Sequence, residues 1–116
     1  MTRKETLAEL IAKVEAGEPS PHYIWQRSLG MHYSLGYRAA GGSLDAAKAL
    51  HEAVLPRWSW AMDQTEKDMK AHCQIWWFQG GKRSKSHVGQ PLANPCPARA
   101  WLLAILRALH SMEPDA

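Results

Sequence analysis

The sequence predicts an α+β fold: a layered sandwich in which helices pack a small antiparallel sheet of two to four strands. Between residues 57 and 78, apolar and polar residues alternate with the period of two that is typical of half-buried strands. Residues 2–16 and 43–55 instead have apolar residues at helical spacing, each behind an N-cap residue. A third helical pattern follows the strands, so the expected order is α-α-β-β-β-α with an uncertain loop between the first two helices.

The first helix is predicted over residues 2–16. Thr2 and Glu5 form a capping box, in which each side chain satisfies a free backbone N–H of the first turn. Gly17 is placed to end the helix, and two prolines follow it. The buried stripe is expected to consist of Leu7, Leu10, Ile11 and Val14.

Residues 22–42 are the least regular part of the chain, rich in aromatics and glycine. A short helix or an extended segment over Tyr23–Leu29 is one interpretation. The remainder is expected to form an ordered loop that is held by its aromatic side chains.

The second helix is predicted over Ser43–Leu55, with Ser43 as N-cap and Asp45 in the first turn, where the helix dipole favours an acid. Pro56 stops it. The expected buried stripe is Leu44, Ala47, Leu50 and Val54, and the expected outer face is Lys48, His51 and Glu52.

A β-hairpin is expected next, with Trp58, Trp60 and Met62 on one strand and Cys73, Ile75 and Trp77 on the other. Trp76 must then point to the opposite face. We favour a second helical layer, formed by the first helix or Trp25, as its cover; exposure as a protein-binding patch is the alternative.

Residues 82–88 alternate weakly and are expected to add a charged edge strand. Asn94 is expected to cap the last helix, in which proline occupies the first turn. Its apolar face is expected to be Ala98, Trp101, Leu102, Ile105, Leu109 and Met112, lying flat on the sheet.

Length and composition indicate a single domain, 1–116, with 46% hydrophobic and 22% charged residues. We expect no membrane span, because no apolar run approaches about 18 residues. The first residues lack the apolar region of a signal peptide, so we expect a cytoplasmic protein with reduced cysteines. The net charge of +3 permits an acidic partner without requiring one.

The runs SLDAAKALHEAVLPRWSW, CQIWWF and NPCPARAWLLAILRAL resemble a group of small phage and prophage proteins described as the phage ABA-sandwich domain. The resemblance covers Ser43–His110, within a family-like core of residues 43–112. It implies helices around a small sheet, a bacterial host cell and no established catalytic residues. The strand and helix order also looks like that of a double-stranded-RNA-binding domain, which is an analogy of topology alone.

Two surfaces are candidates for binding. Basic residues next to aromatics are typical of single-stranded nucleic-acid sites, in which rings stack on bases, although a solvated hairpin loop and guarded edge explain the same residues. That candidate consists of Lys82, Arg83, Lys85 and His87 beside Trp76 and Phe78. The candidate protein-binding residues are Tyr23, Trp25, Tyr33 and Tyr37. A protein partner from the bacterial host or the phage is preferred over nucleic acid, and a homodimer is a further alternative.

Catalysis, metals and cofactors are not expected. The sequence has no nucleophile elbow, zinc-protease motif or phosphate-binding loop, and Cys73, His87 and Cys96 lack the close spacing of structural zinc ligands. A pocket that gathered His22, His32 and His51 would revive an enzyme hypothesis. We therefore expect a non-catalytic binding protein, an inhibitor of a host defence system being one such role.

Overall fold

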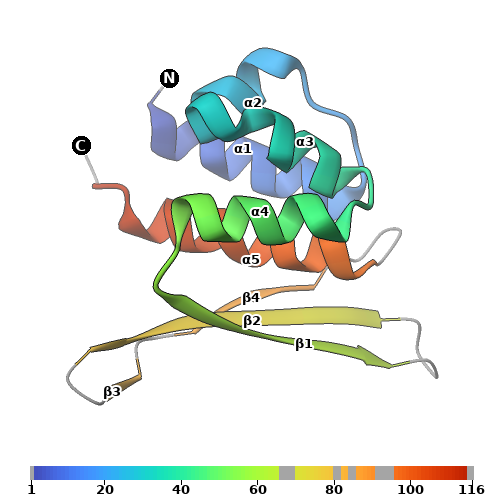
Figure 1. Cartoon of the computed structure of the whole chain (residues 1–116). Helices are drawn as coiled ribbons and strands as arrows, with labels where there is room; N and C mark the ends of the chain where they lie inside the picture. The colour runs from blue at the N-terminus through green and yellow to red at the C-terminus, as the bar shows by residue number, and fades with distance from the viewer. Residues whose placement is uncertain (1, 66–69, 80–81, 84–85, 91–95, 115–116) are drawn as a thin grey trace.

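Helix α5 (Pro97–Met112) lies at the centre of the molecule, between the sheet and the other helices (Figure 1). The computed structural model describes residues 2–65, 70–79, 82–83, 86–90 and 96–114. Apart from its two ends and Arg107, α5 is buried on all sides. The α+β prediction is confirmed. Within the described residues, no helix is both long and apolar enough to cross a lipid bilayer.

The predicted hairpin forms the main part of the sheet. Strands β1 (Trp58–Thr65) and β2 (Lys70–Gln79) pair in antiparallel fashion, with Trp58 opposite Trp77 and Met62 opposite Cys73. Two short strands, β3 (Lys82–Arg83) and β4 (His87–Gly89), also pair with β2. The predicted edge strand over residues 82–88 is therefore broken into two pieces.

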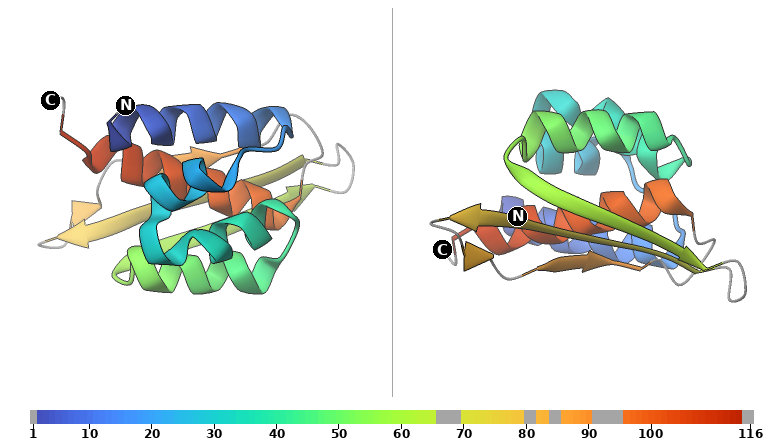
Figure 2. Two further views of the ribbon diagram at one scale, coloured as in Figure 1. Left: turned by 90° about the horizontal axis from the view of Figure 1, so that it is seen from above. Right: turned by 60° about the horizontal axis from the view of Figure 1, so that its bottom comes forward.

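The described helices all lie on one face of the sheet, so the expected helical cover for Trp76 was wrong (Figures 1 and 2). Cys73 and Ile75 are buried beneath α5, and Trp76 alternates to the other face, where it is half-buried. The apolar residues expected above Trp76 belong to the helical side of the molecule instead: Leu7, Leu10 and Trp25 are buried in the main core.

The N-terminal caps that were predicted for the first and second helices are present. Thr2 accepts a hydrogen bond from the Glu5 N–H at the start of α1 (Arg3–Ala16), and Gly17 ends that helix with a φ of 73°. Ser43 accepts from the Ala46 N–H at the start of α4 (Leu44–Val54). Local sequence therefore defines both helices correctly.

The loop that was predicted beyond residue 29 is helical. Helix α2 (His22–Leu29) is followed by a 3₁₀ turn (Gly30–His32) and by α3 (Tyr33–Ala40). No side-chain cap precedes α2 or α3, so the local start signals are missing. These short helices are instead stabilised by burial of Ile24, Trp25, Leu29 and Ala39 in the core.

Three residues were assigned to the wrong faces of their helices. Leu44 and Met112 were expected in the core, but they are 48% and 60% exposed because each lies at a helix end beyond its neighbours. His51 was expected in solvent but is 3% exposed. At the start of α5 the observed cap is Cys96, whose Sγ accepts from the Arg99 N–H at 3.4 Å; Asn94 lies outside the described residues.

Strand β4 lies directly against α5. A Cβ atom on Gly89 would be 1.9 Å from the Ala100 carbonyl oxygen, so only glycine permits this approach. Arg107 holds the same strand from α5 by donating to the Val88 carbonyl at 2.5 Å, and it also pairs with Glu15 of α1. The side chain of Arg107 thus links the sheet, α5 and α1.

Candidate protein-binding site

The site begins with the tight pairing of α2 and α3. Gly30, at a φ of 58°, ends α2 and turns the chain back. Gly36 then faces α2, where an added Cβ would be 2.3 Å from Leu29 Cδ1 and 3.1 Å from the Trp25 ring. The close approach places the Trp25 ring against α3.

Aromatic rings from both helices form a contiguous cluster, the α2–α3 aromatic cluster, made of His22, Trp25, Tyr33 and Tyr37. Tyr37 is at its centre: its ring lies edge-on to His22 with centroids 5.2 Å apart and edge-on to Trp25 at 6.2 Å. Tyr33 lies 6.3 Å from His22. Edge-on contacts of this kind are a preferred aromatic geometry and help to hold the rings in place.

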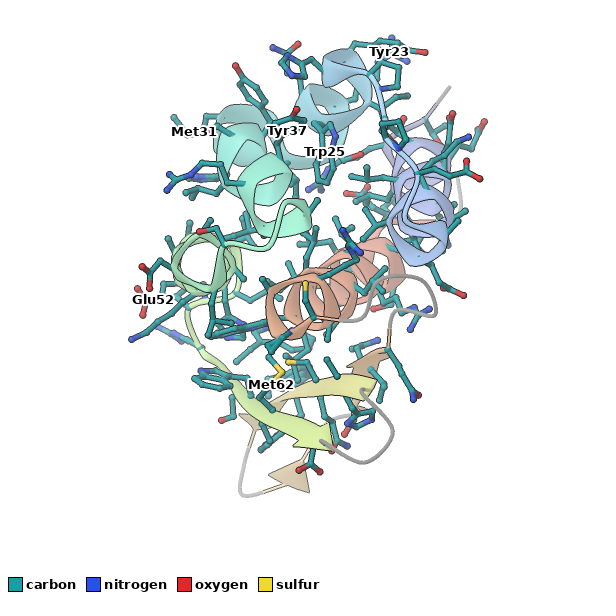
Figure 3. All side chains as sticks on the ribbon, turned by 90° about the vertical axis from the view of Figure 1, so that its right-hand side faces the viewer. Tyr23, Trp25, Met31, Tyr37, Glu52 and Met62 are labelled. Atoms are coloured by element: carbon teal, nitrogen blue, oxygen red, sulfur yellow. The ribbon has the colours of Figure 1, made fainter. Side chains whose placement is uncertain are left out.

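The exposure of the four predicted residues differs. Tyr23 and Tyr37 are 59% and 52% exposed, whereas Trp25 is 3% exposed and Tyr33 is half-buried. Figure 3 shows Tyr23 and Met31 on the outer side of α2 and α3, with Tyr37 beside Trp25 between the two helices. Trp25 is therefore part of the core and contributes only an edge to any binding surface.

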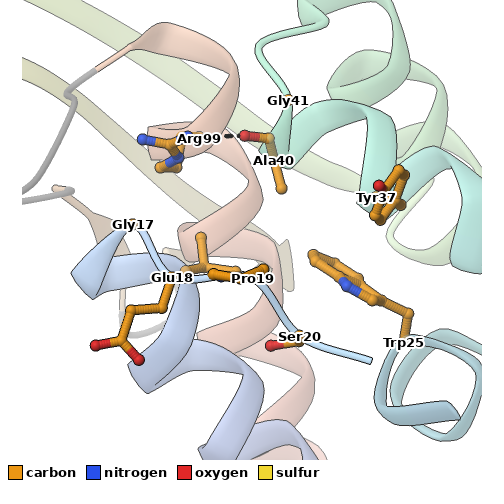
Figure 4. A pocket seen from close by; sticks show the side chains of 10 residues that line it. Gly17, Glu18, Pro19, Ser20, Trp25, Tyr37, Ala40, Gly41 and Arg99 are labelled. Carbon is orange, nitrogen blue, oxygen red and sulfur yellow. Dashed lines mark hydrogen bonds between the residues drawn. The ribbon is translucent and has the colours of Figure 1, made fainter. Parts of the chain in front are cut away.

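Trp25 and Tyr37 form one wall of a pocket of about 280 Å³ (Figure 4). The other walls come from the α1–α2 connection and from the first turn of α5. Arg99 donates from Nη2 to the Ala40 carbonyl at 2.9 Å, which fixes a guanidinium beside the opening. The lining residues are Val14, Gly17, Glu18, Pro19, Ser20, Trp25, Tyr37, Ala40, Gly41 and Arg99.

The pocket combines an apolar wall with charge at its edge. Val14, Pro19 and Trp25 offer apolar surface, while Glu18 is already paired with Lys13 at 2.9 Å. The polar groups of the lining also include the hydroxyl of Ser20, whose Oγ is buried, but among the described residues no histidine lines the pocket to act as a base beside it. Such an arrangement can hold an apolar group beside a negative charge.

The nucleic-acid candidates are only partly brought together. Backbone pairing places Arg83 opposite Phe78 and Lys82 opposite Gln79, so the basic and aromatic segments are adjacent. His87, however, is opposite Ile75 on the helical side of the sheet, with its ring 5.8 Å from Trp58, whereas Trp76 faces the other way. Lys85 lies outside the described residues.

The histidines do not share a pocket. His22 contacts Tyr33 and Tyr37, and His51 lies between α4, β1 and α5, where its ring is 5.7 Å from Trp101. Nowhere in the described ranges do three or more His, Cys, Asp or Glu residues gather as a metal site would require. Burial raises the pKa of the Cys73 thiol to about 12, so it is a poor thiolate ligand.

Sequence reasoning missed the contributions of Pro19 and Arg99 to the pocket and the burial of His51. No local pattern links residues 17–20 with residue 99, which meet only in the folded chain. His51 did have a signal, because it lies four residues after buried Ala47 and therefore on the same helical stripe.

Comparisons with known proteins give no further information about the site. No family model matches this chain, and no curated protein and no solved structure matches it either. The resemblance of residues 43–110 to phage ABA-sandwich proteins therefore stays a prediction.

Proposed function

We propose that this protein is a non-catalytic binding domain that holds a side chain of a partner protein in the Trp25–Tyr37 pocket. The observation that carries this proposal is the position of the pocket beside the exposed face of Tyr37. Binding hot spots are typically aromatic surfaces next to a pocket that excludes water.

The size of the pocket supports a side chain over a larger ligand. At about 280 Å³ it lies just below the usual range of small-molecule sites, about 300–1,000 Å³. An apolar side chain of the partner fits the wall of Val14, Pro19 and Trp25, and an acidic neighbour on the partner suits the guanidinium of Arg99.

Exposed apolar residues extend the surface beyond the pocket. Met31 is 86% exposed on the turn between α2 and α3, and Tyr23 is 59% exposed on α2. Methionine and tyrosine are enriched at protein interfaces because they combine apolar area with adaptable contacts. In line with the phage resemblance, we propose a protein of the bacterial host or the phage as the partner, a defence complex being one candidate.

The test is quantitative capture from a bacterial lysate on immobilised protein. Tyr37→Ala removes the exposed ring, and Ala40→Leu fills the pocket without removing any lining side chain. Met112→Ala is the matched control, because Met112 is also exposed but lies at the far end of α5. A partner retained by wild type and control, and reduced at least about tenfold by both pocket variants, supports the proposal. Equal retention by all four proteins contradicts it.

A second candidate function is nucleic-acid binding at the β2–β3 end of the sheet. It is favoured by the pairing of Lys82 and Arg83 with the aromatic end of β2. Binding of a labelled single-stranded oligonucleotide should weaken steeply with salt and on replacing Lys82, Arg83 and Lys85 by alanine. Salt-independent or absent binding rejects this function and leaves the pocket proposal unaffected.

A further inference from the structure

The two edges of the sheet differ in how they are protected. On one side of β2 lie the short strands β3 and β4, whereas β1 pairs with β2 along all eight residues without a break in register. Among the described strands none pairs with the outer side of β1. Natural proteins usually protect such an edge with proline, lysine or a bulge, and β1 has none of them.

The hydrogen bonds of Trp58 show which backbone groups face this edge. Its N–H donates to the Leu55 carbonyl at 3.0 Å, and its carbonyl accepts from His51 Nε2 at 2.8 Å, so both groups point away from β2. In an antiparallel ladder, alternate residues point their backbone groups outward. Trp60 and Met62 therefore present two N–H and two C=O groups to the open edge.

The side chain of Trp60 provides an anchor beside these groups. It is 44% exposed, and its ring stacks on that of Trp101 with centroids 4.2 Å apart and planes at 34°. Because Trp101 is buried in α5, the exposed part of Trp60 is held in place before any ligand arrives. Helix α4 runs above β1 (Figures 1 and 2) and contacts the strand through His51 at Trp58, but it packs mainly on α3 and α5.

We propose that the β1 edge binds an extended segment of a partner protein by β-strand addition. The segment pairs with the backbone of Trp60 and Met62 and packs an apolar side chain on Trp60. Asp63, the only charge in β1, is exposed on the opposite face, so the segment carries Lys or Arg across from it. The segment therefore runs antiparallel to β1, and its expected sequence pattern is a basic residue opposite Asp63, an apolar residue opposite Met62, any residue, and an apolar residue opposite Trp60.

Charge favours a foreign segment over a second copy of this chain. The twofold pairing that uses all four free backbone groups places Trp60 opposite Met62 of the second copy. Asp63 then faces Ser59, which provides no positive charge. The second copy would also bring its own α4 above a strand pair that already has one α4 above it (Figure 2).

A labelled synthetic peptide, Ser-Lys-Val-Thr-Leu-Thr-Ser, tests the proposal by fluorescence anisotropy. Its lysine is designed to lie opposite Asp63, and its valine and leucine opposite Met62 and Trp60. The matched control peptide has glutamate in place of lysine. Wild type should bind the lysine peptide saturably below about 1 mM and at least about fivefold more tightly than the glutamate peptide.

Two variants distinguish strand addition from nonspecific peptide binding. Met62→Pro removes an outward N–H while keeping the ladder with β2, and it should weaken the lysine peptide by at least about tenfold. Asp63→Lys is an exposed change that should reverse the preference between the two peptides. Thermal melts establish that both variants fold; if Met62→Pro does not, the charge reversal decides by itself.

Three outcomes overturn the proposal. These are no saturable binding by wild type, equal binding of both peptides by wild type and Asp63→Lys, or a wild-type dimer in sedimentation that Met62→Pro dissolves. The last outcome assigns the edge to a second copy. None of them affects the pocket, because Tyr37 and Ala40 lie on α3.

Discussion

Replacing His51 by leucine should destabilise the fold, because this histidine satisfies two polar groups at the junction of α4, β1 and α5. Trp101 Nε1 can only donate, so His51 Nδ1 accepts its hydrogen bond at 3.1 Å and the ring proton lies on Nε2. Nε2 then donates to the Trp58 carbonyl at 2.8 Å. The bound tautomer is neutral.

Leucine has a similar volume, so the main effect of His51→Leu is to leave the Trp101 N–H and the Trp58 carbonyl without their partner. Each unsatisfied buried group costs about 1–3 kcal/mol, so the two groups together give an expected loss of about 2–6 kcal/mol in the free energy of unfolding. For a domain of this size each kcal/mol lowers Tm by roughly 4 °C. His51→Gln, which can still donate to Trp58, should lose less.

The same residue predicts a pH dependence. Burial lowers the pKa of His51 below its ordinary value of 6.5, outweighing the hydrogen bond to Trp58 and the charge of Glu52. The unfolded chain therefore binds a proton more readily, and the stabilisation is fully present above about pH 6.5 and is lost as pH falls below it. One such group contributes a slope of at most about 1.4 kcal/mol per pH unit.

Urea unfolding of wild type, His51→Leu and His51→Gln between pH 8 and pH 5 measures both effects. Wild type should lose stability below pH 6.5 more steeply than either variant, because neither variant has a titrating group at this position. A His51→Leu protein within about 1 kcal/mol of wild type at pH 8, or with an unchanged pH profile, would refute the reasoning.

Other predictions concern packing and thiol reactivity. Gly89→Ala should lower the free energy of unfolding by at least about 2 kcal/mol in urea titrations, because its Cβ would overlap the Ala100 carbonyl of α5; an effect below about 0.5 kcal/mol would show that β4 does not approach α5 so closely. Arg107→Gln should cost about 1–2 kcal/mol and reduce amide exchange protection in β4 more than in β1, because Arg107 holds the Val88 carbonyl; uniform loss of protection would contradict this role. In the Cys96→Ser variant, Cys73 should react with a thiol reagent at pH 8 only as the protein unfolds, because it is fully buried with a pKa near 12, and rapid labelling would contradict its burial.

Much of the fold could be predicted because its cues are local. Thr2 and Ser43 cap helices that begin one residue later, and the alternation of Trp58, Trp60 and Met62 correctly defines one face of β1. Such patterns depend on neighbours within a few residues, so they can be interpreted without the rest of the chain.

The helices of residues 22–40 could not be predicted in the same way. They have no side-chain caps, and α3 contains Gly36, an unfavourable residue in an isolated helix, at the point where it lies against Leu29 and Trp25 of α2. Their stability comes from burial in the shared core, which depends on residues distant in the sequence.

The candidate site was likewise predictable only in part. Aromatic content marked Trp25 and Tyr37 as residues of interest, but the pocket exists only where residues 17–20 and Arg99 meet them.

By itself, the sequence determined the class of fold, three of its helices and the pairing of its main hairpin, since caps and periodicity act over short distances. Only the tertiary structure decided that α5 is central, that the helices cover one face of the sheet and that His51 is buried. Those features depend on which apolar surfaces are buried against one another, and that depends on residues from the whole chain.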